Sequence, residues 1–304
     1  MSLQILLSSY NGEKYIRTQL DSILAQTYQD FTVLIRDDGS MDKTQEILEE
    51  YAQRDSRIIW YGQENIGVVK SFFDLMKHAD LTHNYFAFAD QDDEWLPEKL
   101  EKAIQVLQTN NPIEPVLYCS DKIIVDEELR TLDVQVSRDV RKPSFGNALV
   151  QGICTGCTAV WNRKLMEILI KHIPNYIDNV IMHDWWLYMV ASCMGRVYYD
   201  RHAYIRYRQH QNNKLGAMIT KRQLFFYRIR QLRKPRGEIY RQTKEFVELF
   251  GDEMIAENLN IATRLLKTQK SKISRLLTFN DKEIFRQKVS DDLVLRIIML
   301  LGKL

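Results

Sequence analysis

Two groups of acidic residues stand where hydrophobic segments of the sequence end. They are Asp37 with Asp38, and Asp90 with Asp92 and Asp93. Carboxylates that converge on one crevice repel one another unless a cation lies between them. Mg²⁺ or Mn²⁺ is the simplest such cation, because both take oxygen ligands and share their coordination shell with substrate phosphates. The acids therefore predict a divalent-metal site, although a single Asp-Gly or Asp-Asp pair more commonly forms only a turn or a helix cap.

Alternating strand-like and helix-like segments must position these acids. Strands are expected over residues 4–9, 31–35, 57–61, 85–89 and 116–119. Helix signals follow the first four of them, which is the pattern of an α/β domain with a largely parallel sheet. Ligands of such sheets bind beyond the carboxyl ends of the strands. Both acidic groups are therefore expected to face one crevice.

The other elements are less regular. Asp42 with Gln45 predicts a variant capping box at the start of the second helix. Residues 121–147 are polar enough to predict long loops, and two short strands are expected at 197–199 and 203–207. Beyond Gly216 only amphipathic helices are expected. We therefore predict a main α/β domain over residues 1–215 and a C-terminal basic, amphipathic helical region over 216–304.

Composition and motifs exclude several classes of protein. A chain with 45% hydrophobic and 27% charged residues is typical of a globular protein and not of a disordered one. No Gly-x-Gly-x-x-Gly follows a strand and no Walker-type Gly-Lys-Ser/Thr occurs, which disfavours dinucleotide-binding and P-loop proteins. No export signal and no apolar run of spanning length are found, so a cytoplasmic protein is expected. Cys154 and Cys157 form an isolated C-x-x-C, so buried thiols are expected here.

The formal net charge of +2 hides an asymmetry along the chain. From Met218 onward there are 19 Lys and Arg and 10 Asp and Glu, against 23 and 30 before it. The acidic part suits a cation and the basic part suits an anionic surface. Residues 221–244 interleave apolar side chains with six Arg and three Lys. Such a segment fits nucleic acid, an anionic lipid interface or an ordinary packed helix.

Four motifs, in this order, give the chain a specific resemblance. They are SSYNGEKYI, RDDGSMDKT, ENIGVVKSF and FADQDDEWLPEKL. Together they resemble the nucleotide-sugar half of family 2 glycosyltransferases, which have the GT-A fold, a Rossmann-like sheet flanked by helices. GCTAVWNRKL, HDWW and YRQHQNN resemble more narrowly the bacterial rhamnosyltransferases of rhamnose cell-wall polysaccharide synthesis. The resemblance covers about residues 1–215.

The resemblance implies a role for each matching residue. The implied donor-binding residues are Tyr10, Asn11, Asp37, Asp38, Asp90, Gly156 and Arg208. Among them, Asp37 and Asp38 contact the base and ribose, Gly156 lies beside the sugar and Arg208 faces the diphosphate. Asp92 and His210 are the implied metal ligands. Asp184 is the implied catalytic base, with His183 before it where many relatives have Glu.

The implied reaction is an inverting transfer in a single displacement. A carboxylate serves as base for the acceptor hydroxyl, and a divalent ion neutralises the leaving diphosphate. The implied donor is dTDP-L-rhamnose, and the implied acceptor is a saccharide on a polyprenyl-phosphate carrier. This acceptor favours an anionic membrane over nucleic acid as the partner of the basic tail, with peripheral association at the inner face of the plasma membrane.

Several alternatives stay open. A UDP- or GDP-sugar donor, a nucleotidyltransferase and a non-catalytic membrane-bound assembly subunit would each be compatible with the fold. Asp184 could instead act only as a helix cap, and His210 as a surface residue. Trp185 and Trp186 cannot both face one pocket, because adjacent helix positions point apart, and core packing is the expected role.

Overall fold

The computed structural model describes residues 2–109, 114–132, 141–210 and 237–304, which fall into two compact units. The first comprises Met1–Leu132, Cys154–Ile173 and Gly195–Gly216. The second comprises Asp133–Ile153, Pro174–Met194 and Ala217–Leu304. Two segments from the first two-thirds of the chain therefore pack with the C-terminal helices. The predicted boundary at residue 216 lies outside the described residues.

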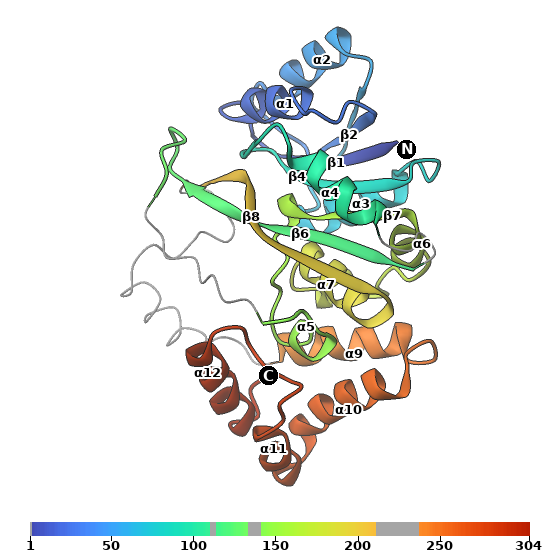
Figure 1. The fold of residues 1–304 in the computed structure, drawn as a ribbon, viewed down its shortest axis with the longest axis vertical. Helices are drawn as coiled ribbons and strands as arrows, with labels where there is room; N and C mark the ends of the chain where they lie inside the picture. Colours follow the sequence, from blue (N-terminus) through green and yellow to red (C-terminus); the bar gives the residue numbers. More distant parts are fainter. Residues whose placement is uncertain (1, 110–113, 133–140, 211–236) are drawn as a thin grey trace. The chain divides into compact units, whose positions relative to one another are not determined.

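The first unit is built on one sheet, in the order β3-β2-β1-β4-β7-β6-β8-β5 (Figure 1). Its strands are β1 (Leu3–Ser9), β2 (Phe31–Asp37), β3 (Ile58–Gly62), β4 (Tyr85–Asp90), β5 (Glu94–Trp95), β6 (Val116–Val125), β7 (Val160–Asn162) and β8 (Arg196–Arg208). β1 pairs in parallel with β2 and β4, and β2 with β3. β7 runs antiparallel to both β4 and β6, and β5 antiparallel to β8. The predicted α/β class is confirmed.

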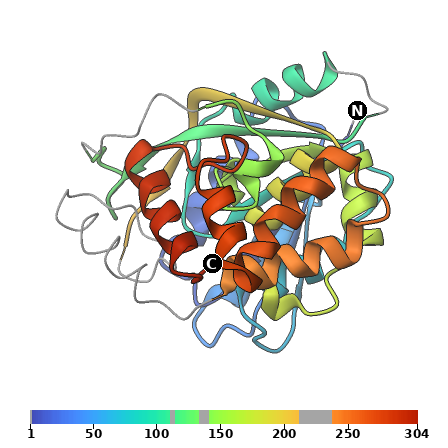
Figure 2. The same ribbon diagram turned by 90° about the horizontal axis from the view of Figure 1, so that it is seen from below.

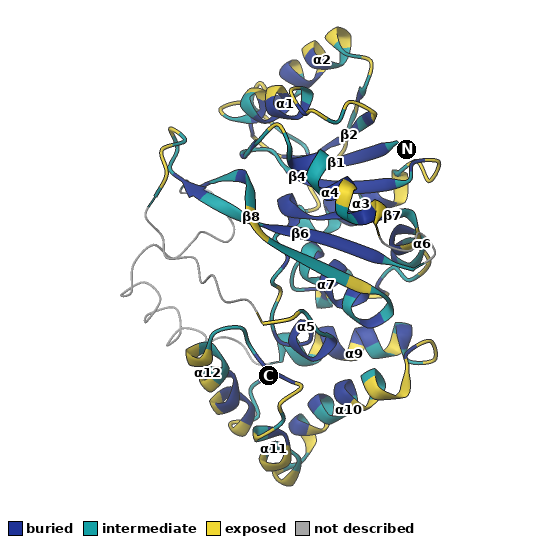
Figure 3. Ribbon diagram, in the orientation of Figure 1, coloured by how far each residue is buried: buried dark blue, intermediate teal, exposed yellow. Residues whose placement is uncertain are grey.

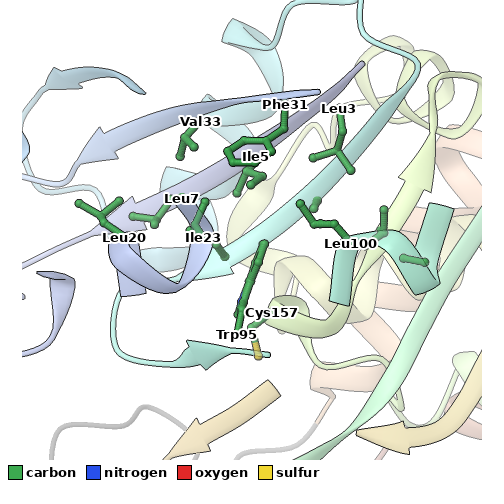
Figure 4. Close-up of a cluster of buried hydrophobic side chains, with 14 of the residues drawn as sticks. Leu3, Ile5, Leu7, Leu20, Ile23, Phe31, Val33, Trp95, Leu100 and Cys157 are labelled. Atoms are coloured by element: carbon green, nitrogen blue, oxygen red, sulfur yellow. The ribbon is translucent and has the colours of Figure 1, made fainter. Parts of the chain in front are cut away.

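Helices of the first unit follow the strands as expected. They are α1 (Ile16–Leu24), α2 (Thr44–Arg54), α3 (Val68–His78), α4 (Lys99–Gln108) and α6 (Arg163–Lys171). α1 shows the reason, because its apolar residues Ile16, Leu20 and Ile23 recur at helical spacing and are all buried. They join a core that includes β1, β2, Trp95 and Cys157 (Figure 4).

Three local predictions are wrong. β6 continues to Val125, through residues 121–125 that the sequence predicts to be loop. These residues pair with β8, and the register of the pairing shifts at Asp121. The two short strands predicted near residue 200 are the single strand β8, which takes its backbone partners from β6. No capping box forms, because the Gln45 amide donates to Asp37 Oδ1 at 2.8 Å instead. Hydrogen bonds with other segments decided all three, between β6 and β8 in the first two cases and between α2 and the end of β2 in the third.

Helices make up the second unit in its described part. They are α5 (Phe145–Ala148), α7 (His183–Met194), α9 (Glu238–Phe250), α10 (Ala256–Lys270), α11 (Lys272–Phe279) and α12 (Val289–Leu300), with the short 3₁₀ helix η2 (Ile177–Asn179). Figure 2 shows α9 to α12 gathered side by side. Trp186 packs against Phe246 and Phe250 at ring-centroid distances of 5.4 and 6.4 Å. In the described part of the chain, every helix is too short or too polar to span a membrane.

Candidate active site

Three loops meet at the carboxyl ends of β2, β1 and β4, which are adjacent in the sheet. The Tyr10 amide donates to Gln91 Oε1 at 2.8 Å, and the Gln91 amide donates to the Tyr10 carbonyl at 2.9 Å. Asn11 has a left-handed φ of 47°, and its backbone amide donates to Ser40 Oγ at 2.8 Å. A Cβ at Gly12 would lie 2.2 Å from Gln91 Oε1, so a larger residue here would displace the Gln91 side chain from its contacts with Tyr10. The two acidic groups therefore end on one edge of the sheet, as predicted.

Asp92 and His210 lie together at this edge. His210 Nε2 is 2.7 Å from Asp92 Oδ2, and both side chains are largely buried. The ring of Tyr15 stacks on His210 with centroids 5.0 Å apart. A carboxylate oxygen and an imidazole nitrogen are both donors that a divalent transition metal accepts. The structure thus brings together the two predicted metal ligands, although 118 positions separate them.

Arg208 holds the end of β8 against the loop after β4. Its Nε donates to the Asp92 carbonyl at 2.7 Å, and its Nη1 donates to the Glu127 carbonyl. The guanidinium carbon also lies 4.7 Å from the centroid of the Tyr15 ring. The side chain is buried and its donors face protein carbonyls. Arg208 therefore fixes the backbone of the loop that carries Asp92, and its predicted contact with a diphosphate stays a prediction.

A second ionisable cluster begins at the residue after Asp92. It is made of Asp93, Lys99 and Cys157, all fully buried. The Arg208 amide donates to Asp93 Oδ1 at 3.1 Å, and burial, together with Asp92 and Asp90, raises the pKa of Asp93 well above its usual range. Burial lowers the pKa of Lys99 to about 7, and its Nζ lies 3.6 Å from the centroid of the Trp95 ring. Burial therefore favours the neutral carboxyl of Asp93 and the neutral amine of Lys99.

Asp90, Asp93 and Cys157 also form a possible ligand set, with ligand atoms within 4.8 Å of one another. Burial and then Asp93 raise the pKa of Cys157, so the thiolate that a metal prefers is disfavoured. All four cysteines are buried and free, as expected. Gly156 is buried and begins η1 (Gly156–Thr158), directly before Cys157.

Asp37 and Asp38 are buried and hydrogen-bonded within the protein. Asp37 accepts from the Ser9 hydroxyl at 3.0 Å, the Ser40 amide at 2.8 Å and the Gln45 amide. Asp38 accepts from the amides of Ile66 and Gly67, both at 2.9 Å, at the start of α3. Asp37 therefore ties together three chain segments, and Asp38 fixes the loop before α3. Their predicted contacts with a nucleotide stay predictions.

Arg36 is a buried site residue that the sequence motifs do not single out. Its side chain is fully buried, pairs with Asp38 and contacts Asp74 Oδ2 at 3.0 Å. It also donates to Ser71 Oγ at 3.2 Å and to the Glu64 carbonyl at 3.0 Å. A charge in an otherwise apolar strand, two positions before an acid, was the available signal.

Asp184 belongs to the second unit, where it is the second residue of α7 and half-buried. Its Oδ1 accepts from the Trp185 amide at 2.7 Å. Trp186 is buried in the core, whereas the Trp185 Nε1 donates to the Ala148 carbonyl at 2.6 Å. The two tryptophans therefore point apart, as predicted. Because α7 begins at His183, Asp184 lies inside its first turn.

Residues 4–193 match the model of Glycosyl transferase family 2. The chain belongs to this family. It is 30% identical to the dTDP-rhamnosyl transferase RfbG of Shigella flexneri over 266 residues, which are 83% of this chain and 87% of that protein. It is also 25% identical to an uncharacterized glycosyltransferase, RT0329 of Rickettsia typhi, over 93% of this chain and 89% of that protein.

Two solved structures have the same fold. TarS of S. aureus in complex with UDP-GlcNAc matches with a TM-score of 0.55 and 16% identity, over 100% of this chain and 93% of that chain. The mannosyltransferase PcManGT of Pyrobaculum calidifontis, in complex with GDP-Man and Mn²⁺, matches with a TM-score of 0.53 and 15% identity, over 99% and 85%. The glycosyltransferase is thus a GT-A protein, as expected.

Proposed function

We propose that this glycosyltransferase transfers L-rhamnose from dTDP-L-rhamnose, with inversion, to a saccharide on a polyprenyl-phosphate carrier. The observation that carries the chemistry is the contact between Asp92 and His210 at the carboxyl edge of the sheet. The donor is supported by the 30% identity to a protein named as a dTDP-rhamnosyl transferase. The acceptor rests on the motif resemblance. We also propose that the catalytic domain ends near residue 216, where the C-terminal helical region begins.

Asp92 and His210 would hold Mg²⁺ or Mn²⁺, which supplies charge neutralisation at the departing diphosphate. The donor types fit, since a carboxylate and a neutral imidazole suit Mn²⁺, and PcManGT was solved with Mn²⁺. Arg208 and Tyr15 keep the pair in place from the side of β8 and α1. Asp90 is half-buried at the end of β4, next to the same loop, where we assign it to the donor ribose.

The donor nucleoside is assigned to the loops after β1 and β2. Tyr10 is exposed and held by Gln91, and Asn11 is held by Ser40, so both present fixed surfaces to a base or ribose. Asp38 is the proposed contact to the base, and Asp37 shapes the loop beside it. Gly156 is proposed to lie beside the sugar, where a side chain would reduce the room for it.

Asp184 is assigned as the general base. As the acceptor oxygen attacks the anomeric carbon, Asp184 accepts the hydroxyl proton, and the nucleoside diphosphate departs from the opposite face of the sugar. A half-buried carboxylate in the first turn of a helix can both reach solvent and hold an acceptor.

A donor panel tests the proposal. Purified enzyme is incubated with a synthetic lipid-linked rhamnose acceptor and with dTDP-rhamnose, UDP-sugars or GDP-sugars, and the released nucleotide and the product anomer are measured. We expect release of dTDP, an inverted linkage and little turnover of the other donors. Turnover of a UDP- or GDP-sugar alone would contradict the assignment of dTDP-L-rhamnose as the donor. Release of pyrophosphate would point to a nucleotidyltransferase, and no turnover with any donor would point to a non-catalytic assembly subunit.

A further inference from the structure

The C-terminal helices α11 and α12 expose an unusual number of large hydrophobic side chains. Eight of the fifteen exposed large hydrophobic residues in the described part of the chain lie between residues 273 and 301. They are Ile273, Leu276, Leu277, Val289, Leu293, Ile297, Leu300 and Leu301. Scattered single exposures are ordinary, but a concentration of them marks an interaction site. We name these eight residues the C-terminal apolar face.

Helical spacing places the residues of each helix on one side. Val289, Leu293 and Ile297 are four residues apart, so they form a stripe along α12. Val289 is 87% exposed and Leu293 57%. The other side of α12 is covered, because Leu295 and Met299 are fully buried. A helix that is apolar on both sides buries both when each has a partner. Among the residues that the structure describes, nothing covers the exposed side of α12.

The arginines of the two helices are used inside the unit. Arg296 is buried and donates to the Thr278 carbonyl at 3.0 Å, which joins α12 to the end of α11. Arg275 donates to the Thr268 carbonyl at 2.8 Å, which joins α11 to α10. These contacts hold both guanidinium groups against backbone carbonyls, and Figure 3 marks exposed positions along both helices.

The part of the chain that contains this face is cationic. Residues 267–304 contain nine Lys and Arg and four Asp and Glu. Asp281 and Glu283 are ion-paired with Arg264, and Asp292 with Arg296. Exposed lysines then dominate the charge: they are Lys267, Lys270, Lys272 and Lys282. An apolar stripe in a lysine-rich segment complements an anionic lipid interface, where the apolar side chains enter the headgroup region and the lysines meet the charge.

Other occupants fit this charge less well. A second copy of the chain would bring the same lysines against each other, which opposes association. Residues 211–236 carry eight Lys and Arg and no Asp or Glu, so they too would meet like charge. We propose that the C-terminal apolar face of α11 and α12 inserts into the surface of an anionic membrane. That this delivers the enzyme to a carrier-linked acceptor rests on the proposed function.

The test compares two matched double variants by co-sedimentation with phosphatidylcholine vesicles, with and without phosphatidylglycerol. Leu293→Gln with Ile297→Gln makes the stripe polar at positions that are already exposed, so folding is retained. Ile59→Gln with Leu81→Gln removes two exposed apolar residues from the first unit. We expect wild type to bind the anionic vesicles, the α12 variant to bind at least about tenfold more weakly, and the control to bind within about twofold of wild type.

Three results would overturn the proposal: wild type that ignores anionic vesicles, an α12 variant that binds like wild type, or equal losses in both variants. A wild-type dimer in sedimentation that the α12 variant abolishes, without vesicle binding, would assign the face to a second copy. If wild type does not bind vesicles and only the α12 variant has a lower melting temperature, the face packs against another segment of the same chain. Transfer to a soluble acceptor is assayed separately, so failed vesicle binding with intact transfer leaves the proposed function standing.

Discussion

At the scale of single residues, Asp92 and His210 carry the metal proposal. Asp92→Asn or His210→Ala removes one of two donors that lie 2.7 Å apart. We expect each change to cut transfer by about 10²-fold or more and to raise the concentration of Mn²⁺ that is needed, because a Lewis acid contributes several kcal/mol to charge stabilisation. Initial rates are measured across a Mn²⁺ titration and in EDTA, which should abolish wild-type transfer.

Exposed residues of the same types provide the controls for this experiment. His202→Ala on β8 and Asp252→Asn after α9 change surface side chains and should leave both rate and metal requirement unaltered. Transfer by Asp92→Asn that equals wild type and persists in EDTA would remove the metal from the proposal.

Asp184 carries the base proposal, and its isosteric variant separates catalysis from binding. Asp184→Asn keeps the size of the side chain and an oxygen that can accept from the Trp185 amide. It removes the basicity, so we expect turnover to fall by about 10² to 10⁴ while donor affinity is kept. Single-turnover rates and calorimetric donor binding check this. Near-normal turnover with a raised donor KM would instead assign Asp184 to binding.

At the scale of elements, α4 begins with a buried lysine that makes stability depend on pH. Burial lowers the pKa of Lys99 to about 7 from the ordinary 10.5. Between these values the unfolded chain binds a proton that the folded chain lacks, so stability rises with pH across this window. Below about pH 7 both states hold the proton, and the burial of the ammonium group lowers stability fully.

Lys99→Met removes this penalty. We expect the variant to exceed wild type in unfolding free energy most strongly at about pH 6, with a difference that shrinks as the pH rises toward about 10. Urea unfolding across this range measures it. Lys77→Met, at an exposed position in the last turn of α3, should show a pH-independent difference. A gain that stays constant between about pH 6 and pH 9 would mean that the folded protein keeps Lys99 protonated across this range.

At the scale of the whole molecule, charge is divided between the acidic first part and the basic tail. Arg228, Arg230, Arg233 and Arg236 lie outside the described residues, so their role is predicted from sequence alone. Each Lys or Arg near an anionic membrane contributes about 1 kcal/mol, and the attraction fades within a Debye length. Changing these four to Glu should therefore abolish binding to anionic vesicles and leave transfer to a soluble acceptor largely intact.

Salt dependence separates this electrostatic contribution from the C-terminal apolar face. Raising the salt concentration should release wild type partly, because screening weakens attraction to lipid charge but not apolar insertion. If the charge-reversed protein binds like wild type, residues 228–236 act in packing or oligomerisation. A loss of vesicle binding in the charge-reversed protein alone would place the membrane contact at residues 228–236. A loss in the α12 variant alone would place it at the C-terminal apolar face.

Local patterns in the sequence determined the strands and helices of the first unit. Each β-loop-α step depends on apolar spacing within one short segment, as in α1, where Ile16, Leu20 and Ile23 all became buried. The acids after β2 and β4 could likewise be placed on one edge, because the carboxyl ends of parallel strands meet there. The ordered motifs indicated the family, which the match over residues 4–193 confirmed.

Tertiary structure decided what depends on partners far away in the chain. The 2.7 Å contact between His210 and Asp92 could be assigned from the sequence only by resemblance, since no local pattern links residues 118 positions apart. The full length of β6 comes from its pairing with β8, and Arg36 is accommodated in an apolar strand only because Asp38 and Asp74 meet it. The exposed side of α12 could not be predicted either. Its apolar residues surround the helix, and only packing determines which of them are covered.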